Sequence, residues 1–221
     1  MSAWIVIAAY YESSSIGDVV SDVIEAGYEN IVVVNDGSDE ATSDAARDAG
    51  ATVLEHAINR GQGAALRTGM EYALRNGAEY IVHFDADGQH QADEIPSMLE
   101  PVRRGDVDIT LGKRFEQSDS IPLSKYVVLQ GAILFQFVLT GLWLSDAHNG
   151  FRAMSRQAAK TLEIKQERMG HATEIIEYIK RHDLRYEEVP VTITYDDDIE
   201  GQGLMNAINI AKKNLFYKFF K

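Results

Sequence analysis

The stretch Ile81-Val82-His83-Phe84-Asp85-Ala86-Asp87-Gly88-Gln89 passes abruptly from mainly apolar to acidic residues. Its first four residues are typical of a short buried strand, because three of them are large and apolar. Asp85 and Asp87 stand two residues apart at the strand end, where both can direct oxygen ligands to one hard cation, such as Mg²⁺ or Mn²⁺ held jointly with substrate phosphates. An ordinary turn is the alternative, since Asp and Gly are favoured in turns. The stretch therefore predicts a buried strand that ends in a candidate metal site.

Apolar runs and helical patterns alternate around this stretch. We expect strands at residues 4–8, 31–34, 52–54 and 80–84, and helices at residues 16–26, 40–49 and 63–76. This alternation predicts an α/β fold, in which helices flank both faces of a mainly parallel central sheet. Ligands of such sheets bind outside the carboxyl ends of the strands. Polar clusters at residues 10–12, 35–38 and 85–87 fall at that edge.

The second half of the chain is less regular. We expect strands at residues 108–112, 151–154 and 187–194, and helices at residues 170–181 and 204–218. Residues 124–144 are strongly apolar, and residues 126–144 carry no charge over nearly the length of a membrane span. The polar residues and glycines within them favour two buried helices, or an apolar surface lying on the bilayer. The lysines and aromatic residues of 212–221 suit the membrane interface, or else a terminal helix docked on the core.

Composition limits the function classes. A chain of 221 residues without repeats or a linker is expected to form one domain. The net charge of −13 argues against a nucleic-acid partner, although a bound divalent ion could still attract phosphorylated substrates. The absence of cysteine excludes disulfides and thiolate chemistry. The first residues do not resemble a signal peptide, so we expect a cytoplasmic location.

Two polar clusters follow or precede predicted elements of the first half. Asp36 lies in a polar run, residues 35–39. The Asp36 carboxylate could accept hydrogen bonds from a base or a ribose. The same run also suits a turn with a helix N-cap at Ser38 or Asp39. Gly61 and Gly63 open a predicted helix, where backbone N–H groups suit a phosphate or a nearby carboxylate. Glycine is also common there for conformational reasons alone.

Further candidates lie in the second half. Arg114 follows a predicted strand, and its guanidinium matches phosphate bidentately, with a solvated surface residue as the alternative. Asp146 and His148 are possible bases or ligands ahead of Arg152. Glu174 falls in the first turn of a predicted helix, which stabilises a carboxylate whatever its function.

The ordered motifs of the chain resemble those of the family 2 glycosyltransferases, and most of all the polyprenyl-phosphate hexosyltransferases typified by dolichol-phosphate mannose synthase. The motifs span nearly the whole chain and are residues 5–12, 32–38, 59–63, 85–89, 112–115 and 146–152. The resemblance implies a GT-A fold and inverting transfer of a hexose from a nucleotide-diphospho-sugar. It also implies Mg²⁺ or Mn²⁺ as cofactor and a polyprenyl or dolichyl phosphate as acceptor, at the cytoplasmic face of a membrane that the protein contacts peripherally.

The resemblance also implies roles for individual residues. It assigns the nucleoside to Ala8, Tyr10, Glu12 and Asp36, and the metal and donor phosphates to Asp85, Asp87 and Gln89. Asp87 and Arg114 would be catalytic, with Arg114 at the acceptor phosphate. Further substrate contacts would come from Gly61, Gly63, Ala86 and Arg152. Residues 1–112 would form the nucleotide-binding half, and residues 113–221 the acceptor-side half.

Some positions depart from the family pattern. Ala8, Tyr11 and Asn35 stand where relatives carry proline, asparagine and aspartate, and the acidic run 196–200 replaces a basic loop. The acidic run favours a second hypothesis, a family 2 enzyme with a glycan or other non-lipid acceptor, whereas residues 124–144 favour the lipid. A non-catalytic nucleotide-sugar-binding module and a nucleotidyltransferase are further alternatives. The sequence does not identify the sugar, the nucleotide or the oligomeric state.

Overall fold

A computed structural model of the protein describes residues 2–114, 141–142, 144–146, 149–168 and 170–194. Seven strands of the described residues form one sheet, namely β1 Ala3–Ala9, β2 Ile31–Asn35, β3 Thr52–Glu55, β4 Tyr80–Asp85, β5 Ile109–Arg114, β6 Arg152–Ser155 and β7 Tyr186–Val191. The described helices are α1 Ile16–Glu25, α2 Glu40–Asp48, α3 Gln62–Arg75, the 3₁₀ turn η1 Ala92–Glu94, α4 Ile95–Arg103, α6 Arg156–Thr161 and α7 His171–Arg181.

The strand order is β3-β2-β1-β4-β6-β5-β7, and only β6 runs antiparallel to its neighbours β4 and β5. The predicted α/β fold with a mainly parallel sheet is therefore confirmed. The chain moves outward from β1 to β3 and then returns to place β4 on the other side of β1. This reversal creates a switch point between the carboxyl ends of β1 and β4, where ligands of open α/β sheets bind.

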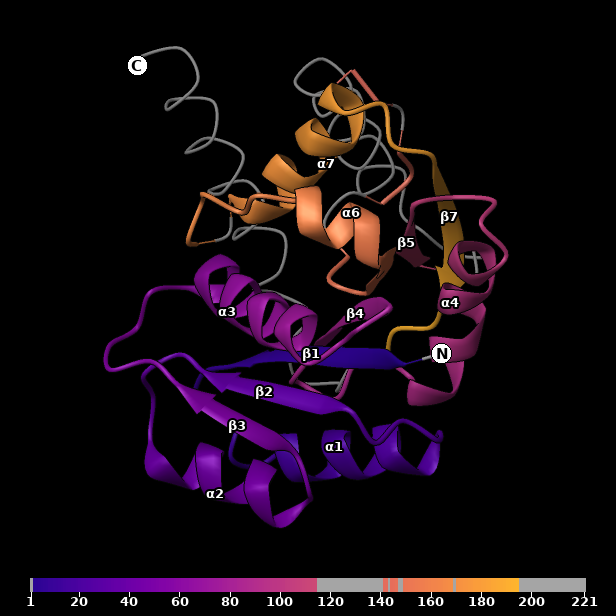
Figure 1. The fold of residues 1–221 in the computed structure, drawn as a ribbon. Coiled ribbons are helices and arrows are strands. Elements are labelled where there is room, and N and C mark those ends of the chain that lie inside the picture. The colour runs from indigo at the N-terminus through magenta and orange to yellow at the C-terminus, as the bar shows by residue number, and fades with distance from the viewer. Residues whose placement is uncertain (1, 115–140, 143, 147–148, 169, 195–221) are drawn as a thin grey trace, which may run out of the picture.

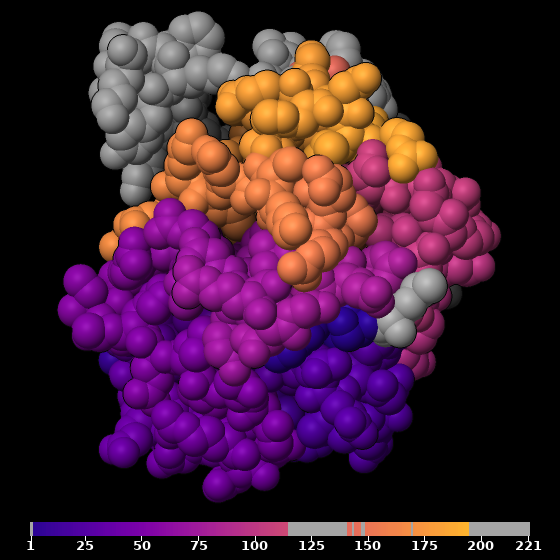
Figure 2. All heavy atoms as spheres, viewed as in Figure 1, coloured from indigo at the N-terminus to yellow at the C-terminus, as the bar shows by residue number. Residues whose placement is uncertain are grey.

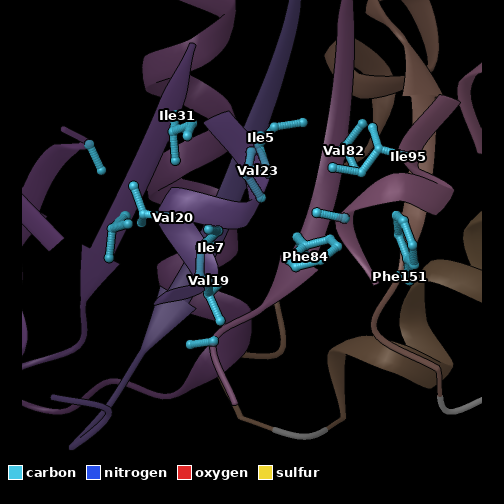
Figure 3. Packing of buried hydrophobic residues seen from close by; sticks show 14 of the residues in the cluster. Ile5, Ile7, Val19, Val20, Val23, Ile31, Val82, Phe84, Ile95 and Phe151 are labelled. Carbon is cyan, nitrogen blue, oxygen red and sulfur yellow. The ribbon is translucent and has the colours of Figure 1, made fainter. Parts of the chain in front are cut away.

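Helices cover both faces of the sheet (Figure 1), as the alternation in the sequence predicted. On one face, α1 buries Val19, Val20 and Val23 against Ile5 and other strand residues, as Figure 3 shows. These residues recur at helical spacing, so one stripe of α1 meets the sheet. On the other face lie α3, α6 and α7, and Figure 2 shows α6 and α7 (orange) packed directly beside α3.

Helix α3 crosses β1 at unusually close range. Gly69 of α3 lies so close to Val6 that any larger side chain would collide with it. The close approach depends on glycine because it has no Cβ. It fixes the position of the start of α3, where Gln62 lies beside the end of β4.

Two differences from the sequence predictions concern helix α4 and strand β7. Helix α4 lies outside the expected ranges, because Pro96 and Pro101 obscure its pattern, although proline is tolerated at a helix start. Strand β7 ends at Val191 rather than at residue 194. The backbone N–H of Thr192 bonds to the Glu94 carboxylate, and that of Thr194 bonds to the Gln89 carbonyl. These bonds draw the chain away from β5 and toward the end of β4.

Within the described part of the chain, no helix is both long enough and apolar enough to cross a membrane. Most of the apolar region 124–144 and the whole predicted helix 204–218 lie outside the described residues, as do His148 and the acidic run 196–200. The expected division into a nucleotide-binding and an acceptor-side half stays a prediction.

Candidate active site

A cavity of about 260 Å³ lies at the switch point of the sheet. Ala8 of β1 and Asp85 of β4 are paired in the sheet register and both border it. Its walls combine acidic, polar and small residues, namely Glu12, Asp85, Asp87, Gln62, Arg152, His171, Ala8, Ala86, Gly150 and Ala172. The cavity therefore gathers residues from both halves of the sequence.

Asp85 is held in place from several sides. Gln62 donates a hydrogen bond from Nε2 to Oδ1 over 3.2 Å, and His90 Nε2 lies 3.0 Å from Oδ2. Gly150 passes so close that a Cβ there would collide with the carboxylate. Desolvation acts to raise the pKa of Asp85, but the hydrogen bond from His90 and the charge of Arg152 outweigh it and lower the pKa. Asp85 is thus a fixed and ionised carboxylate.

Asp87 is more exposed than Asp85 and has fewer partners. Its Oδ1 accepts a hydrogen bond from the backbone N–H of Gln89 at 3.0 Å. Desolvation raises the pKa of Asp87, and the negative charge of Asp85 raises it further. A cation between the two carboxylates would remove this repulsion, because each carboxylate is an oxygen ligand that hard divalent ions prefer.

The two carboxylates fit a divalent ion that shares its coordination with a substrate. Among the described residues, no group of three or more Asp, Glu or His side chains converges as a complete metal site. Gln89, the predicted third ligand, does not border the cavity along the described chain. Mg²⁺ commonly takes one or two protein carboxylates together with water and substrate phosphates. Asp85 and Asp87 suit that mode of binding.

Asp36 occupies a different environment at the same sheet edge. It is 2% exposed, and its carboxylate accepts hydrogen bonds from the backbone N–H groups of Arg60 and Gly61. His56 Nδ1 lies 2.7 Å from its Oδ1. The sequence left open whether the backbone N–H groups of the glycine-rich segment bind a phosphate or a nearby carboxylate. In the structure, the Gly61 N–H binds the carboxylate of Asp36. The contact between Asp36 and a nucleoside stays a prediction.

The glycines of that segment serve close packing. Gly61 has a positive φ of 105°, and any Cβ on Gly63 would collide with the carbonyl of Gln166. Three residues after Asp36, Asp39 accepts a hydrogen bond from the backbone N–H of Thr42. Of the two predicted N-cap candidates, Ser38 and Asp39, it is therefore Asp39 that caps α2. The structure thus ties these glycines to the fold, and their contact with substrate stays a prediction.

The tyrosines after β1 are not among the residues that line the cavity. Tyr10 and Tyr11 are 45% and 61% exposed, and their rings pack edge to face. Tyr11 has a positive φ of 59°, an uncommon conformation for a bulky residue. Glu12 borders the cavity and accepts a hydrogen bond from the Ser15 hydroxyl.

A guanidinium and an imidazole are buried close enough to Asp85 to interact with its charge. Arg152 of β6 is 2% exposed and is paired in the sheet register with His83. Burial lowers the pKa of His83 to about 3, and the positive charge of Arg152 adds to the effect. Burial also lowers the pKa of Arg152, which the Asp85 charge partly opposes. His83 is therefore a neutral imidazole under a buried guanidinium.

Arg114 lies at the end of β5, outside the cavity lining. Its Nε is 2.9 Å from Asp146 Oδ2, and its backbone N–H donates to the same carboxylate. Asp146, a predicted base or ligand, is therefore a partner of Arg114 in this structure. The predicted contact of Arg114 with an acceptor phosphate is not tested by this arrangement.

Six of the predicted site residues border the cavity, namely Ala8, Glu12, Asp85, Ala86, Asp87 and Arg152. Six others lie outside its lining in the described chain, namely Tyr10, Asp36, Gly61, Gly63, Gln89 and Arg114. Sequence reasoning gave no role to Gln62 or His90, the two partners of Asp85. A polar residue between two glycines and a histidine directly after the acidic motif were the available signals.

Comparisons with known proteins agree with this geometry. Residues 4–163 match the model of the family described as glycosyl transferase family 2. An uncharacterised protein of Methanocaldococcus jannaschii is 33% identical over 98% of this chain and 92% of its own length. The UDP-N-acetylglucosamine–dolichyl-phosphate N-acetylglucosaminyltransferase of Methanococcus voltae is 29% identical over 99% of this chain and 96% of its own length.

Among solved structures, glucosyl-3-phosphoglycerate synthase of Mycobacterium tuberculosis in complex with Mn²⁺ and UDP-glucose superposes with a TM-score of 0.74. The match covers 98% of this chain and 78% of that one at 15% sequence identity, which shows a shared fold. The chain therefore belongs to glycosyl transferase family 2, has the GT-A fold, and resembles the branch that acts on polyprenyl phosphates.

Proposed function

We propose that this glycosyltransferase moves a hexosyl group from a nucleotide-diphospho-sugar to a polyprenyl phosphate, with inversion at the anomeric carbon. The observation that carries the proposal is the cavity at the switch point, whose lining combines Asp85 and Asp87 with the buried Arg152. The name of the Methanococcus voltae relative, a dolichyl-phosphate glycosyltransferase, supports the acceptor class.

The side chains of the cavity would divide the work between them. Asp85 and Asp87 would hold Mg²⁺ or Mn²⁺, which when bound supplies Lewis-acid stabilisation of the diphosphate leaving group. Gln62 and His90 orient the Asp85 carboxylate, so that it need not reorganise when the donor binds. Gly150 leaves room for that orientation.

The acceptor in this proposal needs little activation. An oxygen of the acceptor phosphate attacks the anomeric carbon, and the bond from that carbon to the nucleoside diphosphate breaks. Because a phosphate monoester is already anionic at neutral pH, a strong general base is not required. This agrees with a cavity in which carboxylates and a guanidinium, rather than a histidine–carboxylate relay to a nucleophile, dominate the lining.

The place of the reaction is also part of the proposal. We place it at the cytoplasmic face of a membrane, with peripheral contact through the apolar residues 124–144 and the lysine- and aromatic-rich residues 212–221. Co-sedimentation of the protein with liposomes of polar lipids would test this contact. Protein that stays in the supernatant at low ionic strength would contradict it.

The donor and the cation are best tested by ligand-induced stabilisation. UDP-, GDP- and dTDP-sugars would be compared in a thermal-shift panel, each with and without Mn²⁺. A ligand that binds the native state raises the melting temperature by mass action, so the preferred donor should stand out and should depend on Mn²⁺. Transfer of its labelled sugar to farnesyl phosphate would then test the reaction.

A second candidate function differs only in the acceptor. The acidic run 196–200 would repel a phosphate, which favours a glycan or another non-lipid acceptor. Supplying the preferred donor with either farnesyl phosphate or neutral oligosaccharides separates the two. Transfer to oligosaccharides alone would contradict the polyprenyl-phosphate proposal.

A further inference from the structure

Arg152 is a buried charge for which the described residues provide no ion-pair partner. Arg152 of β6 borders the cavity and is 2% exposed, and its Nη1 has no hydrogen-bond partner among the described residues. Within the described residues, no carboxylate oxygen lies within ion-pair distance of the guanidinium; Asp85 and Asp146 act on it only from farther away. A buried ion without hydrogen bonds costs stability, so such an arrangement suggests that something else occupies its donors.

Arg156, four residues later, shows what a structural arginine looks like in the same fold. Its Nη1 donates to the carbonyl of Ala78, and its Nη2 donates to the carbonyl of Leu74 over 3.1 Å. These bonds join the start of α6 to the end of α3. Arg152 has no equivalent bonds among the described residues, so its guanidinium does not hold elements together in that way.

The beginning of α7 lies in the same cavity wall. His171 and Ala172 border the cavity, and the helix N-cap, Gly170, supplies no side-chain cap. The first N–H groups of a helix lack acceptors within the helix and carry its positive dipole end, so they suit an anion. The His171 N–H already donates to the carbonyl of Arg168, so the donor that the first turn of α7 offers here is the N–H of Ala172, which borders the cavity. The Glu174 carboxylate does not take this place, because it accepts hydrogen bonds from the backbone N–H groups of Lys165 and Gln166.

We propose that the Arg152 guanidinium and the first turn of α7 form a subsite for a phosphate oxyanion within this cavity. Arginine presents paired donors that match two phosphate oxygens, and here they are preorganised by burial. The bound phosphate group is either that of the acceptor monophosphate or one of the donor diphosphate. Only the naming of these two sources rests on the proposed function. Because Asp85 and Asp87 border the same cavity, Mg²⁺ should strengthen phosphate binding by offsetting their charge.

The test compares R152M with R156M as a matched control. Without ligand, R152M should melt at the wild-type temperature or higher, because it removes a buried charge that has no ion-pair partner in the described part of the chain. R156M should melt lower, because two carbonyls lose their donor. An R152M protein that is destabilised as strongly as R156M would contradict the subsite. The R152K protein keeps the positive charge but loses the paired donors of the guanidinium. Its affinity for phosphate should therefore lie between those of the wild-type and R152M proteins.

Binding is measured by calorimetry with Mg²⁺ and three probes, namely inorganic phosphate, farnesyl phosphate, and UDP or GDP. R152M should lose at least about tenfold in affinity for one or more probes, whereas R156M keeps wild-type affinity. Loss for farnesyl phosphate identifies the acceptor as the source, and loss for the nucleotide identifies the donor. Wild-type affinity of R152M for all three probes, or no binding of any probe to the wild-type protein, would overturn the subsite.

The outcome is separable from that of the proposed function. A wild-type protein that transfers sugar to farnesyl phosphate, together with an R152M protein that binds every probe normally, would refute the subsite alone. An R152M protein that loses phosphate affinity, together with a wild-type protein inactive on farnesyl phosphate, would refute the proposed acceptor alone.

Discussion

Two acidic sites at one edge of the sheet, Asp36 and the Asp85–Asp87 pair, differ in their environment. Asp36, after β2, is buried, and the backbone of residues 60–61 satisfies its carboxylate. Asp85 and Asp87, at and just after the end of β4, border a cavity, and Asp87 keeps a raised pKa there. Internal donors contact all three carboxylates, but only Asp85 and Asp87 also border the cavity and so remain accessible to a ligand. Asp36 is expected to hold a loop, and the Asp85–Asp87 pair is expected to hold a ligand.

The largest effect is expected from D87A. Loss of this carboxylate should reduce sugar transfer by at least about a thousandfold, because stabilisation of the leaving group depends on the bound cation. The fold should persist, since the described contacts of Asp87 are confined to its own turn. Turnover with saturating Mn²⁺, with circular dichroism as the folding control, measures this. Full activity in D87A would exclude the assigned site.

The second effect concerns stability at the other aspartate. D36N replaces one acceptor oxygen by a donor that faces backbone N–H groups, so it should lower the free energy of unfolding by about 2–3 kcal/mol. Urea unfolding measures this, with D48N at the exposed end of α2 as a control that should change little. An unfolding free energy of D36N equal to that of D48N would show that Asp36 does not fix the loop.

The next effect concerns the orientation of Asp85. H90F keeps a ring between Phe84 and Phe151 but removes the hydrogen bond to the carboxylate. The affinity for Mn²⁺, followed by electron paramagnetic resonance, should fall about tenfold, as is typical when a partner of a metal ligand is lost. H90N, which retains a donor, should recover part of that affinity. Unchanged Mn²⁺ affinity in H90F would rule out a positioning role.

The smallest effect is expected at Tyr11, which follows β1 outside the cavity lining. Asparagine tolerates a positive φ better than tyrosine does, so Y11N should raise the free energy of unfolding by about 1 kcal/mol. Y10N is the matched control, because Tyr10 does not have a positive φ. Equal changes in the two variants would show that the backbone of Tyr11 stores no strain.

Sequence alone could predict much of the first half. Its helices and strands alternate with clear periodicity, so the parallel sheet, an N-cap at Ser38 or Asp39 and the edge position of Asp85 followed from local patterns, and the structure places the cap at Asp39. The same patterns could not distinguish Asp36 from Asp85. That distinction depends on the path of residues 56–61, which supply the donors to Asp36.

The burial and the neighbours of Arg152 could not be predicted from the sequence either. Residues 151–154 were predicted to form a strand, but not one that inserts antiparallel between β4 and β5. This pairing brings Arg152 opposite His83 and under the cavity. It joins segments far apart in the chain, and local periodicity carries no information on such neighbours. The resemblance to the family supplied Arg152 as a candidate, and the fold supplied its burial.

Mn²⁺-dependent donor binding in the wild-type, D36N and D87A proteins is the most direct test of the contrast between the two acidic sites. The preferred nucleotide sugar would be titrated into each protein by calorimetry, with and without Mn²⁺, at a temperature where all three are folded. We predict that Mn²⁺ strengthens donor binding in the wild-type and D36N proteins but not in D87A. Mn²⁺-dependent binding that survives in D87A and disappears in D36N would contradict the assignment of the site to β4.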